Sequence, residues 1–382
     1  MRRALILVSR IFARFHFWMA SAWVLELAGP LADLDASSVG RLAYTLMMSS
    51  DQPSAHRLFR RLLRRNLGKS APVNLALADM AQRLGRLRLA RLIHTRTSAT
   101  PGNSLQHASA HSMAELLQGI LSGTLYADIG AAVDSLNLTP GQAETVILVP
   151  VSTSYLDLFQ LWIEQARQYA HGDLVAVALD PAAREILERD FSCRVLDLSP
   201  FFVFDSAGRI DAYSRNWLWV LRVIVLRELI PRGYTVLSLD LDAILLDDVN
   251  VMLSTFPQVD IVAQKDYSLP VDVARDLGFV LCCGFMLFRP TQPTIAFLDG
   301  YRELTIQELH DQIALNHLIA RAGTTNMAKT DRYMTFQSAG VAFLCPDKSL
   351  VSRDIKYGSV IRHFQQIGQS IARLRSELGL GG

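Results

Sequence analysis

The sequence predicts an α/β fold: a doubly wound, mostly parallel sheet flanked by helices and preceded by an all-helical N-terminal domain. From about residue 143 onward, apolar runs of strand length alternate with amphipathic helical segments, which is typical of β/α units. Before about residue 135, apolar residues recur only at helical spacing. We therefore expect a helical domain over residues 1–140 and a sheet-containing domain over residues 141–382, with Thr139-Pro140-Gly141 at their boundary.

The composition fits two folded domains with large cores. The chain has 382 residues, of which 50% are hydrophobic and 19% are charged. A net charge of +2 argues against a nucleic-acid-binding protein. Arginine is concentrated in residues 1–140, which are net basic, whereas the remainder is net acidic. This division indicates two units with different tasks.

The four cysteines do not suggest a disulfide scaffold or a zinc site. Two of them, Cys282 and Cys283, are adjacent, and no pair has the C-x-x-C spacing of metal ligands. A disulfide between neighbouring residues is strained, so we expect both thiols to be reduced and buried. A reducing compartment is the simpler inference.

The first 29 residues are apolar and aromatic but are interrupted by Arg10, Arg14 and His16. No apolar run reaches the roughly 20 residues that a spanning helix needs, and no clean signal-peptide core follows Arg2 and Arg3. The pattern predicts a basic amphipathic helix. It would either make peripheral contact with an anionic membrane or belong to the helical core, and we favour the core reading. A cytoplasmic location is favoured.

The rest of the N-terminal part reads as further helices. Leu62 and Leu63 lie on an apolar stripe between arginines, at amphipathic helical spacing. The segment 75–93 has the same character, and its L-G-R-L-x-x-A pattern faintly resembles one tetratricopeptide-type unit. These helices would bind the acceptor or a partner.

The later part alternates strands and helices. Strands are predicted at 145–151, 174–179, 194–198, 235–239, 260–263, 279–288, 341–344 and 360–363, and the last two are expected to close the sheet. Helices are predicted at 156–169, 182–189, 217–230, 294–305 and 311–322. Sheets of this kind bind ligands at the carboxyl ends of their strands.

An acidic pair stands directly after the buried strand 235–239. If the strand continued, Asp240 and Asp242 would point to the same side, because strand side chains alternate with a period of two. Two neighbouring carboxylates repel each other, and a divalent cation is the usual neutralising partner. The alternative is a pair of solvated acids at a strand end.

Five segments in order carry a family resemblance. They are W-L-W-V-L-R-V-I-V-L-R-E-L-I-P-R-G-Y-T-V-L-S-L-D-L-D, V-D-I-V-A-Q-K-D, L-C-C-G-F-M-L-F-R-P-T, D-Q-I-A-L-N and V-I-R-H-F-Q-Q-I-G. Over roughly residues 143–368 they resemble the nucleotide-diphospho-sugar transferase family, which are glycosyltransferases with a GT-A-like, Rossmann-type fold and a DxD motif. The resemblance implies a domain that binds a nucleotide-sugar donor.

The resemblance also implies a metal site. Mn²⁺, or Mg²⁺ in its place, would neutralise the diphosphate of the donor. Asp242 would be a direct ligand, and Asp240 would bind the metal through water or contact the ribose. His363 would supply the third protein contact, since Mn²⁺ tolerates imidazole. The alternative for His363 is an ordinary histidine at a strand end.

Other candidate residues follow the same resemblance. Asp311, with Gln312 beside it, would orient the donor sugar or the acceptor, although Asp311 also suits the first turn of a helix. Arg222 lies mid-helix among apolar residues and needs an anion, either the diphosphate or Asp240, unless it forms a purely structural ion pair. The nucleoside end of the donor would meet three residues after the first two strands: Thr153, Tyr155 and Asp180.

One position departs from the family pattern, because Cys282-Cys283 stands where an Asn followed by a small residue is common. This leaves the donated sugar open. The resemblance implies a metal-dependent glycosyltransferase, with UDP-sugar the favoured donor, retention of configuration, and an unknown glycan, protein or small molecule as acceptor. The alternatives are a sugar nucleotidyltransferase and a non-catalytic helical interaction protein with a degenerate transferase domain.

Overall fold

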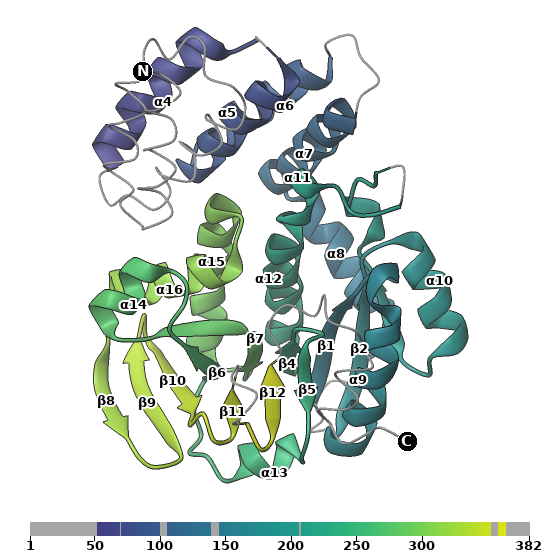
Figure 1. Ribbon diagram of the computed structural model, residues 1–382, viewed down its shortest axis with the longest axis vertical. Helices are drawn as coiled ribbons and strands as arrows, with labels where there is room; N and C mark the ends of the chain where they lie inside the picture. Colours follow the sequence, from purple (N-terminus) through teal and green to yellow (C-terminus); the bar gives the residue numbers. More distant parts are fainter. Residues whose placement is uncertain are drawn as a thin grey trace, which may run out of the picture. The chain divides into compact units, whose positions relative to one another are not determined.

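The structure is a computed structural model that describes residues 52–68, 70–99, 105–138, 145–205, 208–352 and 358–363 (Figure 1). The basic helix predicted within residues 1–29 and the boundary tripeptide Thr139–Gly141 lie outside these residues. Two compact units emerge. The helical unit holds the described residues up to Ala127 together with Val203–Leu218 and Ile306–His310, and the α/β unit holds the others. The domain division at residue 140 stays a prediction.

The helical unit contains α4 (Gln52–Asn66), α5 (Ala71–Arg83), α6 (Leu87–Ser98), α7 (Leu105–Ser122) and α11 (Ala212–Arg215). On α4, Phe59 and Leu62 are buried whereas Arg60 and Arg64 are exposed, so the amphipathic prediction is confirmed there. The helical stretch predicted over 75–93 is broken into α5 and α6. Gly85 lies at the break with φ +69°, a backbone angle that L-residues avoid in a helix.

Hydrogen bonds attach the two later segments of the chain to these helices. Gln82 Nε2 donates to the carbonyl of Ile306 over 2.7 Å. Ser109 Oγ donates to Asp211 Oδ2 over 2.8 Å in a buried setting. These segments therefore belong to the helical unit although they lie far along the sequence.

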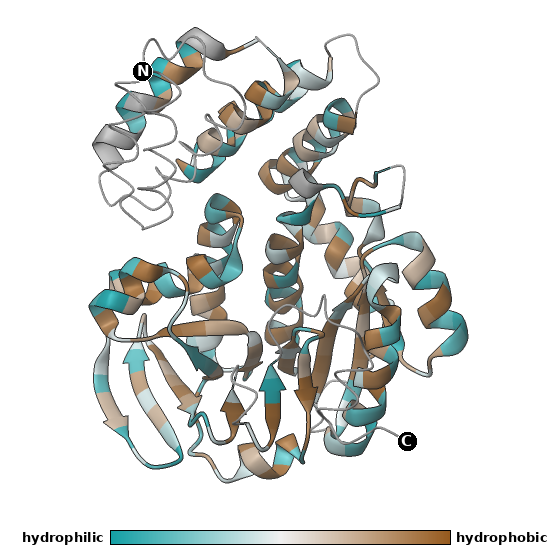
Figure 2. Cartoon of the chain, in the orientation of Figure 1, coloured by the Kyte–Doolittle hydropathy of each residue, from teal (hydrophilic) through white to brown (hydrophobic). Residues whose placement is uncertain are grey.

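The α/β unit is built on a nine-stranded sheet with the order β3-β2-β1-β4-β7-β6-β10-β9-β8. The strands are β1 (Thr145–Val151), β2 (Gly172–Ala178), β3 (Arg194–Asp197), β4 (Thr235–Leu239), β6 (Ile261–Asp266), β7 (Val280–Phe288), β8 (Thr325–Lys329), β9 (Tyr333–Ser338) and β10 (Val341–Pro346). Most of these strands are coloured hydrophobic in Figure 2, as expected for strands buried on both faces of the sheet. Strand β8, in contrast, is exposed along its whole length.

The predicted α/β fold is confirmed, but the sheet is mixed. Strands β3, β2, β1 and β4 are parallel, whereas β7 runs antiparallel to both β4 and β6. The connection from β6 to β7 holds the short helix α14 (Val271–Leu277), and the chain then returns along β6 in the opposite direction. Strands β9 and β10 are joined by the tight turn Ala339-Gly340 and therefore also pair antiparallel.

A second, three-stranded sheet has the order β11-β12-β5. It is made of β5 (Ala243–Leu245), β11 (Val351–Ser352) and β12 (Ile361–His363). The prediction that residues 360–363 close the main sheet is therefore wrong, whereas 341–344 does join it as β10. Because β12 pairs antiparallel with β5, His363 lies opposite Ala243, one residue after Asp242. This pairing places the end of the described chain beside the acidic pair.

The helices of the α/β unit agree with the predicted series. They are α8 (Thr124–Asp134, which begins in the helical unit), α9 (Leu156–Tyr169), α10 (Pro181–Asp190), α12 (Trp217–Leu229), α13 (Val249–Ser254), α14, α15 (Gln292–Glu308) and α16 (Asp311–Ala322), with short 3₁₀ turns η2 (Thr153–Tyr155), η3 (Ser199–Phe201) and η4 (Ile230–Arg232). Within the described ranges no single helix is long and apolar enough to cross a membrane, and α7 with α8 passes that test only as a bent pair.

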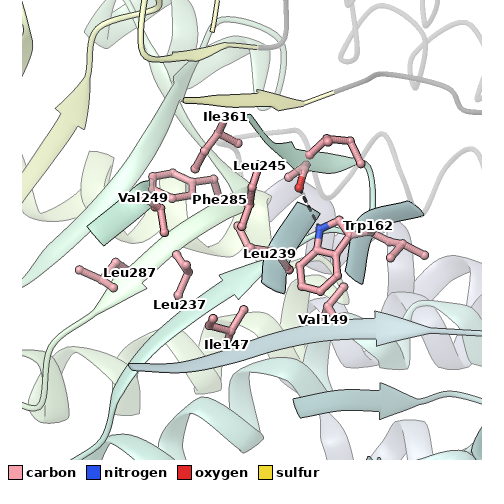
Figure 3. Close-up of a cluster of buried hydrophobic side chains, with 14 of the residues drawn as sticks. Ile147, Val149, Trp162, Leu237, Leu239, Leu245, Val249, Phe285, Leu287 and Ile361 are labelled. Atoms are coloured by element: carbon pink, nitrogen blue, oxygen red, sulfur yellow. Dashed lines mark hydrogen bonds between the residues drawn. The ribbon is translucent and has the colours of Figure 1, made fainter. Parts of the chain in front are cut away.

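A buried cluster joins the two sheets (Figure 3). It combines Leu237 and Leu239 of β4 with Leu245 of β5 and Ile361 of β12. Trp162 of α9 is fully buried against them, and its indole Nε1 donates to the carbonyl of Ala243 over 3.0 Å. The small sheet is thus held firmly against the strand that precedes the acidic pair.

Candidate active site

The acidic pair lies in the turn between β4 and β5. The strand stops at Leu239, and the Ala243 N–H bonds back to the Asp240 carbonyl over 2.9 Å. The Asp240 N–H donates to the carbonyl of Gly284 on β7, also over 2.9 Å. About a quarter of each carboxylate side chain is exposed, 26% for Asp240 and 28% for Asp242. The backbone of Asp240 is therefore fixed, and both carboxylates remain accessible at the carboxyl end of β4.

His363 completes a group of three potential metal ligands. Its Nε2 lies 3.0 Å from Asp242 Oδ1 and 3.9 Å from Asp240 Oδ2. The ligand atoms of these three residues lie within 4.8 Å of one another. Two carboxylate oxygens and one imidazole nitrogen suit Mn²⁺ and are compatible with Mg²⁺, so the residues fit the cation that the sequence suggests.

The imidazole of His363 occupies a closely fitted position. A Cβ atom on Gly284 would stand 2.1 Å from His363 Cε1, so a residue with a side chain there would displace the ring. On its other side, His363 Nδ1 lies 3.0 Å from Gln264 Oε1 and 3.7 Å from Cys282 Sγ. Only 1% of His363 is exposed. The ring is therefore held in one place with Nε2 toward the acids.

The acids control the charge of His363. Burial by itself lowers the pKa of His363, but the hydrogen bonds to Asp242 and Cys282 raise this pKa to about 10. In the metal-free protein the ring is thus a cation that partly neutralises the acidic pair. A divalent cation between the same groups would replace the Nε2 proton and perform the same neutralisation.

Arg222 of α12 links the acidic pair to α16. Its Nη1 donates to Asp240 Oδ1 over 2.6 Å, and its Nη2 donates to Asp311 Oδ2. The guanidinium also lies 4.9 Å from the centre of the Trp219 ring, within cation–π range. Burial opposes the charge, but Asp311 and Asp240 raise the pKa of Arg222 well above its usual value. Arg222 therefore stays charged and orients both carboxylates.

Asp311 begins α16 and is 2% exposed. Beside it, burial raises the pKa values of Cys283 and Tyr301, which lie 3.5 Å apart, so both groups stay neutral. Gln312 uses its side-chain nitrogen to donate to the carbonyl of Leu269 over 2.7 Å. The backbone N–H of Gln312 donates to Asp311 Oδ1 over 2.7 Å, so Gln312 contacts the charged network through its backbone and Leu269 through its side chain.

Thr153, Tyr155 and Asp180 form a second cluster at the carboxyl ends of β1 and β2. Asp180 caps α10 by accepting from Ala183 N over 2.8 Å, and it also accepts from the backbone N–H of Thr153 over 2.7 Å and from the Thr153 hydroxyl. Tyr155 is 50% exposed. The structure thus pairs Thr153 with Asp180 and leaves the ring of Tyr155 open to a planar group.

Two residues of the site had no sequence signal of their own. Gln264 and Gly284 stand in segments that resemble the family, yet neither spacing nor residue type marked them as neighbours of His363. Their contacts cross 99 positions for Gln264 and depend on the pairing of β12 with β5. Only the tertiary structure reveals them.

Comparisons with known proteins agree with this architecture. Residues 169–345 match the sequence model of the family described as nucleotide-diphospho-sugar transferase. The chain is also 20% identical over 194 residues to arabinosyltransferase XEG113 of Arabidopsis thaliana, which covers 47% of this chain and 29% of that protein. The chain therefore spans less than a third of that relative.

Two solved structures show weaker likeness. The apo structure of WbbM, a bifunctional glycosyltransferase, is 15% identical, covers 47% of this chain and 38% of its own, and has a TM-score of 0.32. Mouse xyloside xylosyltransferase 1 is 16% identical, covers 46% and 82%, and has a TM-score of 0.29. Likenesses of this size carry no functional weight.

The α/β sheet and the matched segment together resemble the sugar-transferring domain of that family. Residues 169–345 match the nucleotide-diphospho-sugar transferase family, and they include β4, the acidic pair, Arg222 and Asp311.

Proposed function

We propose that this protein transfers a sugar from a nucleotide diphosphate sugar, with UDP-sugar the favoured donor, in a reaction that requires Mn²⁺ or Mg²⁺. The observation that carries the proposal is the convergence of Asp240, Asp242 and His363 at the carboxyl end of β4. In open α/β sheets this edge is where ligands bind. The family match over residues 169–345 supports the nucleotide-sugar class of donor.

Each residue of the network has a part in this proposal. Asp242 and His363 would hold the cation directly, and Asp240 would share the cation with the ribose. When bound, the metal supplies Lewis-acid stabilisation of the charge that develops on the diphosphate leaving group. Arg222 orients Asp240 and Asp311 through its two hydrogen bonds. Asp311 would align hydroxyl groups of the sugar or the acceptor.

The nucleoside end of the donor would lie at the second cluster. Tyr155 offers an exposed ring for stacking on the base. The Asp180 carboxylate holds the Thr153 backbone in place and could also accept from the base. Gln312 stays a candidate for sugar contact. Retention of configuration is part of the proposal, since no carboxylate has been assigned as an inverting base.

The proposal also covers the acceptor of the sugar. A glycan, a protein or a small molecule would be selected by the helices that precede the α/β unit. Peripheral membrane contact through residues 1–29 and a cytoplasmic location stay predictions, and the first concerns a segment outside the described residues.

The test is to incubate the purified chain with a panel of nucleotide sugars and Mn²⁺ and to measure released UDP or GDP. We expect release with one donor, loss of release on chelation, and loss in Asp242→Ala. Asp276→Ala is the matched control, because this acid is exposed and pairs with its neighbour Arg275. Release that survives Asp242→Ala would overturn the site, and the absence of both release and metal-dependent UDP binding would overturn the function.

The same assay separates the alternatives. A nucleotidyltransferase would release pyrophosphate from a nucleoside triphosphate and a sugar phosphate. A non-catalytic interaction protein would release nothing from any donor.

A further inference from the structure

Gln264 of β6 is a fully buried amide, 0% exposed, whose only hydrogen bond in the described structure is to His363. Its Oε1 lies 3.0 Å from His363 Nδ1, and its Nε2 finds no partner among the described residues. A buried amide nitrogen without a partner costs about 1–3 kcal/mol. Gln264 and His363 are therefore matched to each other within this buried setting.

The chemistry of the contact sets the tautomer of the ring. An amide oxygen accepts hydrogen bonds and cannot donate them, so His363 Nδ1 must carry the hydrogen. A neutral imidazole then has its lone pair on Nε2, which is the nitrogen 3.0 Å from Asp242 Oδ1. Reversal of the amide would place Nε2 of Gln264 against Nδ1 and would favour the other tautomer, whose lone pair points away from the acids.

The surrounding backbone holds this arrangement. The register of β6 and β7 shifts between Ala263, which pairs with Met286, and Gln264, which pairs with Cys282. The extra residues of β7 include Gly284, whose missing side chain leaves room for the imidazole. Gln264 therefore reaches His363 opposite the bulged part of β7, where Gly284 leaves room for the ring.

We propose that Gln264 is a positioning residue that holds His363 in the Nδ1–H tautomer and so presents Nε2 to the metal. The inference rests on the proposed metal site. Partners that orient a metal-binding histidine in this way typically change metal affinity by about 10–100-fold when they are removed. Gln264 acts through His363 and does not itself touch the cation.

The first test compares Mn²⁺ affinity, measured by titration calorimetry, in the wild type and three variants. Gln264→Met keeps the length of the side chain but removes the acceptor, and we expect affinity to fall about tenfold. Gln264→Glu keeps an acceptor oxygen, and we expect it to bind within about threefold of the wild type. Gln258→Met makes the same exchange at an exposed glutamine that bonds to Arg289, and it serves as the matched control with little expected change.

The second test reads the tautomer directly in the wild-type protein. Long-range ¹H–¹⁵N spectra of histidine-labelled wild-type protein with Mg²⁺ should show His363 protonated at Nδ1, its signals assigned by their loss in His363→Gln. Protonation at Nε2 would overturn the proposal, and so would unchanged affinity and tautomer in folded Gln264→Met. If the wild type bound no divalent cation at all, the proposed function would fail instead, so the two failures are distinguishable.

Discussion

Each unit of the protein buries a histidine, and the two histidines are held in opposite states. His94 of α6 in the helical unit is 5% exposed, and burial lowers its pKa to about 4. His363 of the α/β unit is 1% exposed, yet its hydrogen bonds to Asp242 and Cys282 outweigh burial and raise its pKa to about 10. Burial alone thus makes a histidine neutral, whereas burial beside carboxylates makes it a cation or a metal ligand.

The largest expected effect comes from exchanging each histidine for glutamine. His363→Gln should lower donor turnover by roughly 1000-fold, about 4 kcal/mol, because one of three ligands is lost and the cation is misplaced. His94→Gln should leave turnover per folded molecule unchanged. Measurement of kcat/KM for nucleotide release tests both, and equal losses in the two variants would contradict the functional difference between the units.

The next effect concerns the buried ion pairs of Arg222. Arg222→Met should destabilise the metal-free protein by about 3–5 kcal/mol, because Asp311 and Asp240 lose their buried counter-charge. Chemical denaturation of the metal-free protein measures this loss of stability. Asp311→Asn added to Arg222→Met should recover part of the loss. For comparison, Arg275→Met breaks an exposed pair and should cost less than about 1 kcal/mol.

The pH dependence of stability should differ in sign between the histidines. The folded-state pKa of His94 lies below its ordinary value of 6.5, so the unfolded chain takes up the proton first as pH falls. Stability that is present above pH 6.5 should therefore fall by roughly 3 kcal/mol between pH 6.5 and 4. The free energy of unfolding, measured by denaturation at each pH across that range, should change less with pH in His94→Met than in the wild type.

His363 should make stability depend on pH in the neutral-to-alkaline range instead. Its folded-state pKa is raised, so in the metal-free protein its contribution is fully present below pH 6.5 and is lost as pH rises toward 10. His363→Gln should abolish the loss of stability at alkaline pH and leave unchanged the loss at acidic pH that His94 causes. An alkaline slope that persisted in the variant would show that another group causes it.

The smallest effect concerns helix caps. Asp248 of the α/β unit caps α13 by accepting from the backbone N–H groups of Asn250 and Val251, so Asp248→Ala should cost about 1 kcal/mol. Ser70 precedes α5 of the helical unit but makes no capping bond through its side chain. Ser70→Ala should therefore cost only a few tenths of a kcal/mol in the same denaturation assay.

Local pattern was enough to predict the elements that are long or strongly apolar. Strands β1 and β4 and helices α9 and α16 begin and end where their apolar runs do. The acidic pair was found because it follows such a strand. The resemblance to a family pointed to His363, but local pattern placed its strand in the wrong sheet.

The remainder depends on contacts that leave no periodic trace. Strands β11 and β12 have two and three residues, too few for an alternation to be recognised. The antiparallel direction of β7 is set by its pairing with β4 and β6, and Gln264 contacts His363 opposite a bulge in β7. Each is a consequence of tertiary packing, which a linear pattern does not record.

The pairing of β5 with β12 also makes the site a topological link. Asp242 and His363 are 121 positions apart, and an ion shared between them would close that whole length of chain as a reversible cross-link. At a cation concentration one hundred times the Kd, such binding would stabilise the native state by about 2.7 kcal/mol. The ion would then stabilise the fold as well as bind the donor.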